Sequence, residues 1–544
     1  MGSTGRLPAL VVVALLAATV RVSAEPCPVA DPDGFRDEHG RTARPSNALP
    51  APATNNDCGF YNWAWRSFMY VTQRTPANDP VFLHYPTVEE AFPAAFGAQA
   101  GLAETDDRRR IVDLNPAKFE FLSAPDAEQA RPAPLLNDGV RQAAHGGDGA
   151  TLVDPNGNPI FYSINLNEDY VDFVRDNKLD EILRLFARPG KDPEAVPADL
   201  EFRPGALELK SSWMVIEGSP ARYSNYIVAR ARVPMLKNVV DASGSHVAVD
   251  SARPPREVNV ALLGLHVVGA IDGHPEFVWA TFEHANDAGE RDLAPAAPAN
   301  PDPAAPAAPD LGDAEGYALF GNKAAADKAD LRVDQPVRED QKFAAPTPVY
   351  RQFPGSQATK PGDGEAAAPW EDPAVYNLNA AVGALFARRD PDKTDWRRNY
   401  RLVGAVWIDQ PRGLAPADAM KNAAVDADGN EVLIASDGKV PGGANAAIVR
   451  NFDAGLTFAG EDSRLAGENR LSNMAMESFT QPADMAPHCL SCHNTEDQVT
   501  SVPGKIVWAR RINMSHALSI AVEAYLARHP QTAGDAGVEK SASD

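Results

Sequence analysis

The chain has 544 residues, with 51 Lys and Arg against 74 Asp and Glu, so its formal net charge at pH 7 is −23. This acidity argues against nucleic acid and anionic membrane surfaces as partners, and it is compatible with a cationic partner protein. The 47 prolines and 39 glycines predict many turns and a loop-rich, partly β architecture.

The N-terminus has the pattern of a secretory signal peptide. Arg6 precedes an apolar run at residues 7–20, and Val22-Ser23-Ala24 offers a small-residue cleavage site. We therefore expect residues 1–24 to be removed and the protein to be exported, to the periplasm of a Gram-negative cell. No later stretch is long and apolar enough to predict a membrane span.

The sequence contains four cysteines. Cys489 and Cys492 stand close together near the C-terminus, which leaves Cys27 and Cys58 as a pair. In an oxidising compartment such an even remainder predicts one disulfide bond. The alternative is two reactive thiols, and it is disfavoured because no neighbouring His or Lys would lower the pKa of either thiol.

Residues 25–465 are expected to form a β-rich body around an antiparallel sheet. Apolar and polar residues alternate over 207–215, which predicts a half-buried strand. Residues 258–271 are apolar on both faces and are expected to form a central strand. Asp272-Gly273 predicts a hairpin turn, and residues 277–283 predict the returning strand.

A further strand is predicted at residues 400–408, after a Pro/Ala-rich stretch near 294–311. The Pro/Ala-rich stretch cannot form a core, so it is a linker or an insertion. We expect the later strand to rejoin the earlier sheet, which would make the stretch an insertion. On the predicted strand at 207–215, Glu208 and Lys210 share a face and are expected to form an ion pair.

Near the C-terminus the chain reads Cys489-Leu490-Ser491-Cys492-His493, a C-x-x-C-H motif. This spacing places both thiols and the imidazole on one face of a helical turn, where the thiols can reach the two vinyl groups of a porphyrin and the imidazole can bind its iron. A thioredoxin-like dithiol would need a βαβ pattern, and a zinc site would need further ligands at matched spacing. The motif therefore predicts one covalently bound haem c, held by both cysteines and ligated by the histidine.

Residues 466–544 are expected to form a small all-α haem region whose order of elements resembles the class I cytochrome c fold. Residues 471–480 predict a helix before the motif, and residues 515–528 predict one after it. We expect the distal ligand of the iron to be Met514 or His516, which precede or begin the last helix. An open sixth position is the remaining alternative.

Seven separated segments together resemble a group of large bacterial cytochrome c family proteins with a single C-terminal haem. The segments are 63–68, 206–213, 264–268, 277–284, 400–407, 472–479 and 489–493. This resemblance implies a large body ahead of a covalently bound haem, and it implies no particular reaction.

Two histidines outside the motif are candidates for chemistry. His266 is expected mid-strand on a face with Val260, Leu262 and Val268, where it is either a hydrogen-bonded core residue or a proton carrier near the haem. His284 is expected at a strand end, which is the better position for a substrate cleft because strand ends lead into loops.

The haem motif and the export signal predict an exported monohaem c-type cytochrome that exchanges electrons with a redox partner protein. The alternative is a haem-dependent periplasmic oxidoreductase with its substrate site in the β-rich body. No recognisable catalytic set accompanies the motif, so the sequence leaves open whether the protein is an enzyme, and we favour the electron carrier.

Overall fold

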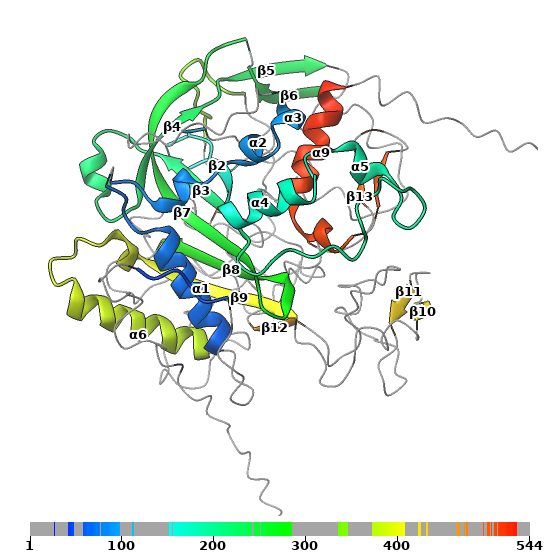
Figure 1. Ribbon diagram of the computed structural model, residues 1–544. Helices are drawn as coiled ribbons and strands as arrows, with labels where there is room; N and C mark the ends of the chain where they lie inside the picture. The colour runs from blue at the N-terminus through cyan, green and yellow to red at the C-terminus, as the bar shows by residue number, and fades with distance from the viewer. Residues whose placement is uncertain are drawn as a thin grey trace, which may run out of the picture.

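The computed structural model is an α+β fold in which helices cover both faces of one sheet (Figure 1). The predicted signal peptide, the Pro/Ala-rich stretch and both cysteines of the C-x-x-C-H motif lie outside the residues that the structure describes. The described residues are 27, 42–47, 58–76, 78–97, 111–113, 152–154, 156–241, 244–250, 252–284, 336–345, 373–408, 423–425, 431–433, 465–467, 473, 475–476, 493, 498–500, 502, 505–508 and 510–529.

The sheet has eight strands along the path β1-β4-β7-β8-β9-β12, with β3 on the other edge of β7 and β2 beside β3. All pairs are antiparallel except β1 with β4. The strands are β1 (Ile111–Asp113), β2 (Phe161–Leu166), β3 (Leu207–Val215), β4 (Val228–Val233), β7 (Arg256–Ile271), β8 (His274–His284), β9 (Tyr400–Ile408) and β12 (Leu465–Gly467).

The predicted strands are confirmed at the centre of this sheet. β3 and β9 have the predicted bounds, and β7 is the long central strand. The turn between β7 and β8 contains Gly273 at φ +80°, a left-handed conformation that favours glycine. β9 pairs with β8, so the strand after the Pro/Ala-rich stretch does rejoin the sheet.

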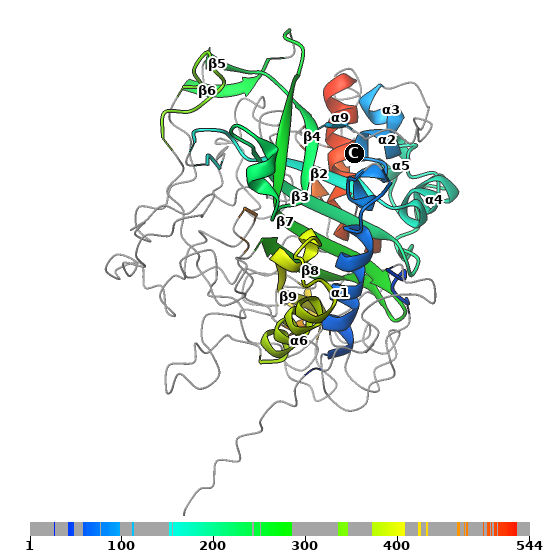
Figure 2. The same cartoon turned by 90° about the vertical axis from the view of Figure 1, so that its left-hand side faces the viewer.

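One face of the sheet is covered by α1 (Cys58–Val71) and α6 (Pro373–Arg389), as Figures 1 and 2 show. The aromatic run of the sequence forms α1 and packs into this core, where the Phe68 ring stacks on Phe282 of β8 at a centroid distance of 4.3 Å. Trp65 meets the same ring edge-on and donates its indole N–H to Asn379 of α6. Aromatic burial of this kind is a large stabilising contribution.

The opposite face is covered by short helices from the N-terminal half and by the last helix of the chain (Figure 1). The helices there are α2 (Val88–Ala91), α3 (Pro93–Phe96), α4 (Glu168–Asp176), α5 (Leu183–Phe186) and α9 (His516–Arg528). The described C-terminal segments share one apolar core with α2 to α4 and the sheet. They also include a pair of short strands, β13 (Gln498–Val499) with β14 (Ile506–Val507). The C-terminal region was expected to be all-α, so this strand pair differs from the prediction.

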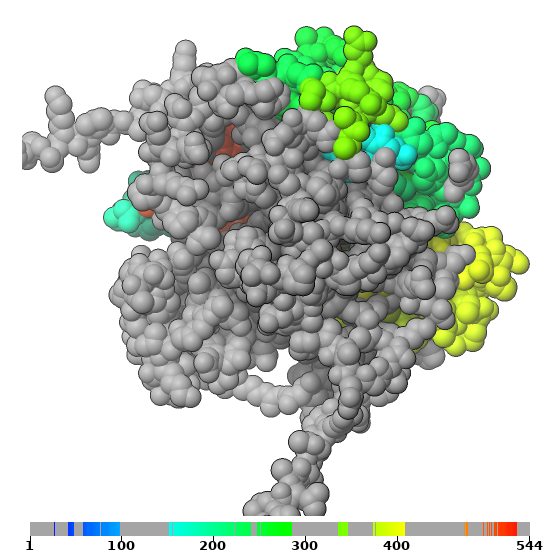
Figure 3. All heavy atoms as spheres, turned by 180° about the vertical axis from the view of Figure 1, so that it is seen from behind, coloured from blue at the N-terminus to red at the C-terminus, as the bar shows by residue number. Residues whose placement is uncertain are grey.

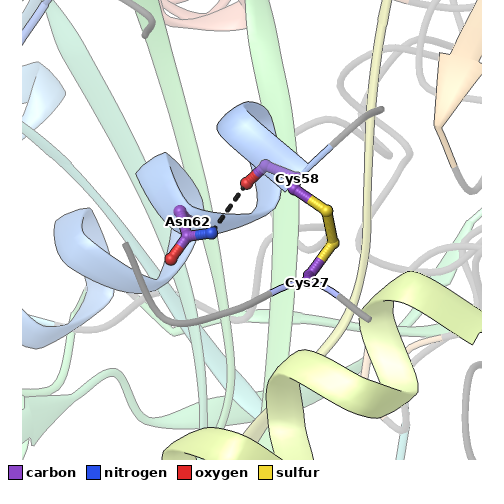
Figure 4. The surroundings of a disulfide bond; sticks show 3 residues. All are labelled: Cys27, Cys58 and Asn62. Carbon is purple, nitrogen blue, oxygen red and sulfur yellow. Dashed lines mark hydrogen bonds between the residues drawn. A yellow bond between two sulfur atoms is a disulfide. The ribbon is translucent and has the colours of Figure 1, made fainter. Parts of the chain in front are cut away.

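A disulfide joins Cys27 to Cys58, the first residue of α1, with their Cα atoms 5.4 Å apart (Figure 4). This is the pairing predicted from the cysteine count. The Asn62 side chain donates to the Cys58 carbonyl one helical turn back, at 2.9 Å. The bridge therefore fixes residue 27 against the N-terminal turn of the helix that covers the sheet.

The remaining elements of the described chain are a separate ribbon, a short strand pair and four 3₁₀ helices. β5 (Leu236–Asp241) and β6 (Gly244–Val249) form a two-stranded ribbon, whose green segment lies at the upper edge of the rear view with the yellow α6 segment below it (Figure 3). The others are β10 (Ala423–Val425), β11 (Glu431–Leu433), η1 (Val81–His84), η3 (Pro220–Tyr223), η5 (Trp396–Asn399) and η6 (Arg511–Met514). Of these, η1, η5 and η6 contribute side chains to the two cores. In the part of the chain that the structure describes, no helix combines the length and the apolar character that crossing a membrane requires.

The predicted helix at 471–480 is not found at its three described residues. Asn473, Ala475 and Met476 lie in irregular and turn conformations. The Asn473 side chain accepts from the backbone N–H of Ala475 at 3.1 Å, and its amide donates to Thr281 of β8. Such a side-chain bond to a nearby backbone group competes with the helical hydrogen bonds that the apolar spacing predicted.

Candidate functional site

The segment that precedes the C-x-x-C-H motif packs against the α9 side of the sheet. The Asn473 amide donates to Thr281 Oγ1 at 2.8 Å and to the Phe282 carbonyl at 3.0 Å. The Tyr162 hydroxyl of β2 donates to the Ala475 carbonyl at 2.7 Å. A Cβ at Gly264 of β7 would lie only 2.6 Å from Asn473 Oδ1, so a larger residue there would displace the Asn473 side chain.

His493, the histidine of the motif, lies against the same face. Its ring is 4.1 Å from the Trp279 ring of β8, centroid to centroid, at an interplanar angle of 42°. Its Nδ1 is 2.8 Å from the backbone carbonyl of Met514. Since a carbonyl only accepts, Nδ1 carries a proton. When the ring is neutral, the lone pair is then on Nε2, which is the form of histidine that binds a metal ion. His493 thus has the tautomer that the predicted proximal ligand of a haem requires.

The two candidate distal ligands both lie next to His493. The Met514 carbonyl is on the Nδ1 side of the His493 ring, and the Met514 side chain is buried in the apolar core with α9. The His516 ring stacks on the His493 ring with centroids 3.5 Å apart and an interplanar angle of 20°. Two imidazoles that ligate one ion from opposite sides have the ion between their nitrogens, so rings stacked in this way do not oppose each other across an iron. The choice of distal ligand therefore stays a prediction.

A buried carboxyl lies beside this group. Glu208 of β3 accepts a hydrogen bond from Ser515 Oγ at 2.6 Å, and Ser515 Oγ is 2.5 Å from the Tyr170 hydroxyl of α4. Burial raises the pKa of Glu208 to about 7, although the Ser515 hydrogen bond and the charge of Lys210 both lower it. Burial also raises the pKa of Tyr170 well above its ordinary value. The charge of Lys210 acts on the Glu208 carboxyl as expected, and the hydrogen bond of that carboxyl comes from Ser515, which tertiary folding brings to it.

Arg510 anchors the segment that precedes α9 to the region of α5. Its guanidinium is fully buried and donates to the carbonyls of Leu185, Ala187, Val196 and Trp508 at distances between 2.6 and 3.1 Å. Carbonyl oxygens at and beyond the C-terminus of α5 carry partial negative charge, which suits a buried cation. This bonding positions the segment that leads into Met514 and His516.

His266 lies on β7 on the same face as Trp279 and is half-buried. The predicted company of Val260 and Leu262 is wrong, since both belong to the core under α1, and only Val268 belongs to the α9-side core. The reason is a bulge, because β3 pairs with Gly264 and then with Leu262. One unpaired residue reverses which face the following side chains occupy.

In the sheet register His266 stands between Lys210 of β3 and Thr281 of β8. These three residues form a polar row across central strands, and the neighbouring row contains Glu208, Val268 and Trp279. The candidate proton carrier is therefore one row away from the residue that contacts His493.

His284 is not part of this group. It is buried at the end of β8, where its ring stacks on Tyr226 at 3.6 Å and meets Tyr400 edge-on at 5.3 Å. Its Nε2 is 3.1 Å from the Asn225 carbonyl. His284 is five residues beyond Trp279, about 16 Å of strand, and an odd separation places it on the other face.

Sequence reasoning missed Trp279, Tyr170 and Ser515. Alternation in the β8 sequence could have placed Trp279 on the face of Thr281, away from Phe282. Nothing local could have shown that Ser515 meets Glu208, because 307 residues separate them.

Comparison of the chain with protein-family models, with curated proteins and with solved structures gives no match. The geometry of the site and the chemistry of the motif are therefore the grounds on which a function is argued.

Proposed function

We propose that this protein is a monohaem c-type cytochrome that transfers electrons, with one haem bound covalently through Cys489 and Cys492 and ligated by His493. The observation that carries the proposal is the hydrogen bond from His493 Nδ1 to the Met514 carbonyl, because with Nδ1 as the donor Nε2 would be the ring atom that binds iron. A C-x-x-C-H motif supplies the two thiols and the imidazole that such a haem needs.

The haem would supply a one-electron couple, and the chain's own residues would hold it in a setting suited to that use. Trp279 and the apolar core beside α9 exclude water from one side of His493. The net charge of −23 favours a cationic redox partner. Export to the periplasm agrees with the Cys27–Cys58 disulfide, since such bonds persist in oxidising compartments.

A haem-dependent oxidoreductase is the second candidate, and two observations favour it. The His516 ring stacks on the His493 ring and does not stand opposite it, so an exchangeable sixth position fits the arrangement. Lys210 and His266, which are partly exposed neighbours on the same sheet face, are polar enough to bind a substrate.

The test is expression of the full chain in a host with a cytochrome c maturation system. We expect a haemochrome spectrum and a mass raised by one covalently bound haem, and we expect both to be lost in Cys489→Ser/Cys492→Ser. The matched control is His529→Ala, an exposed histidine after the last helix, which should keep its haem. A wild-type chain without covalent haem contradicts the proposal.

Addition of carbon monoxide to the reduced protein separates the two candidates. An electron carrier with a six-coordinate iron keeps its spectrum, whereas rapid binding of carbon monoxide favours the oxidoreductase.

A further inference from the structure

Ser515, Glu208 and Tyr170 form a buried hydrogen-bond network, whose direction follows when the Glu208 carboxylate is ionised and can only accept. Ser515 donates its one hydroxyl proton to Glu208 Oε2 at 2.6 Å. The Tyr170 hydroxyl, 2.5 Å from Ser515 Oγ, must therefore be the donor in the second bond. The three side chains come from α4, β3 and the residue before α9, and all are buried.

Two features of this hydrogen-bond network lower the free energy of unfolding of the protein. Ser515 is the N-cap of α9, yet its side chain makes no capping hydrogen bond. A serine that caps a helix normally contributes about 1 kcal/mol, so its use elsewhere has a cost. Burial of the Glu208 carboxyl is also unfavourable, as its raised pKa indicates. If these three side chains served only to hold the fold together, apolar side chains of similar size would stabilise it more.

The peptide unit between Met514 and Ser515 connects this hydrogen-bond network to His493. The carbonyl of Met514, which accepts the Nδ1 proton of His493, and the amide of Ser515 belong to the same planar group. The Ser515 N–H donates to the Ile512 carbonyl at 3.1 Å, and its hydroxyl bonds Glu208. Holding Ser515 from both sides fixes the direction of the Met514 carbonyl.

We propose that Glu208 is a positioning residue for His493, acting through Ser515 on the carbonyl that accepts the Nδ1 proton. A well-aligned acceptor increases the electron donation of Nε2 to a bound metal ion, which stabilises the ferric over the ferrous state. The inference rests on the proposed haem, and it assigns the network a role in setting the haem potential.

The experiment measures the midpoint potential of the haem-loaded full chain by spectroelectrochemical titration. We expect Glu208→Gln and Ser515→Ala each to shift the ferric–ferrous equilibrium toward ferrous by about tenfold, which corresponds to about 59 mV for a one-electron couple. The double variant should equal Ser515→Ala alone, because the two residues act in series. Ser515→Thr keeps the hydroxyl and should restore the potential.

The matched control is Ser211→Ala on the same strand. Ser211 is buried on the opposite face, where its hydroxyl accepts from Trp213 and donates to the Ser163 carbonyl. The Ser211→Ala variant loses as many side-chain hydrogen bonds as Ser515→Ala, and it should leave the midpoint potential of the haem unchanged. If Glu208→Gln does not accumulate, Tyr170→Phe removes the other bond to Ser515 and should shift the potential in the same direction.

The outcomes separate this inference from the proposed function. A haem-loaded protein whose potential is unchanged in both single variants overturns the positioning role and leaves the cytochrome intact. Additive shifts in the double variant also overturn it, since they indicate two independent effects. Absence of covalent haem from the wild-type chain overturns both.

Discussion

The two faces of the central sheet differ in what they bury. The face under α1 and α6 is lined by aromatic and aliphatic residues, such as Phe282 stacked on Phe68. The face under α9 carries ionisable and polar side chains on the same strands, among them Glu208, His266 and Glu283. One pattern of alternation thus builds a stabilising face and a face suited to chemistry, and substitutions on the two faces should have different consequences.

The largest loss of stability is expected from Phe282→Ala on the apolar face. Phe282 is fully buried, and its removal leaves a cavity between Phe68 and Trp65. We expect the free energy of unfolding to fall by about 3–5 kcal/mol in urea titrations, with no change in the haem absorbance spectrum. A changed spectrum at unaltered stability would contradict the division between the faces.

Arg401→Ala tests the polar face. The Arg401 guanidinium is 3.1 Å from the fully buried Glu283 carboxylate, which the substitution leaves without this cation. Removal of one partner of a buried pair is expected to lower the free energy of unfolding by about 3–5 kcal/mol. The double variant Glu283→Gln/Arg401→Met should lose clearly less in the same urea titration. An equal loss would show that the pair itself, and not the unpaired charge, is responsible.

Removal of the disulfide should affect the apolar face alone. Cys27 and Cys58 are 31 residues apart. On the loop-entropy account, the bond lowers the entropy of the unfolded chain and so raises the free energy of unfolding by about 3–4 kcal/mol. We expect Cys27→Ser/Cys58→Ser to lower the urea midpoint accordingly, while the haem potential stays the same. A shifted potential would mean that α1 influences the opposite face.

The polar face should also make stability depend on pH. The pKa of Glu208 is about 7 in the folded chain against an ordinary value of 4.5. Its contribution to the free energy of unfolding is therefore fully present below about pH 4.5 and is lost as the pH rises through about 7. The loss is on the order of 3 kcal/mol. Urea titrations at low and high pH should show a smaller pH dependence in Glu208→Gln than in the wild type.

Some pH dependence is expected to persist in that variant. Burial raises the pKa of Asp154 to about 6 from 3.8, so its contribution also falls as the pH rises, over a lower range. If Glu208→Gln has the full pH dependence of the wild type, the carboxyl of Glu208 does not titrate in this range.

The sequence by itself determined the central strands, the Gly273 turn and the pairing of Cys27 with Cys58. Strand alternation and turn chemistry depend on neighbouring residues, and a cysteine pair follows from counting. Local reasoning failed for the face of Leu262, because a single bulge reverses alternation, and for Asn473, because its side chain bonds a distant strand.

Only the tertiary structure decided which groups surround His493. Trp279 reaches it from a strand more than 200 residues earlier in the chain, and Glu208 meets Ser515 across 307 residues. Sequence patterns report which face of an element a side chain occupies. They contain no information on which distant element packs there, because that depends on the packing of the whole sheet.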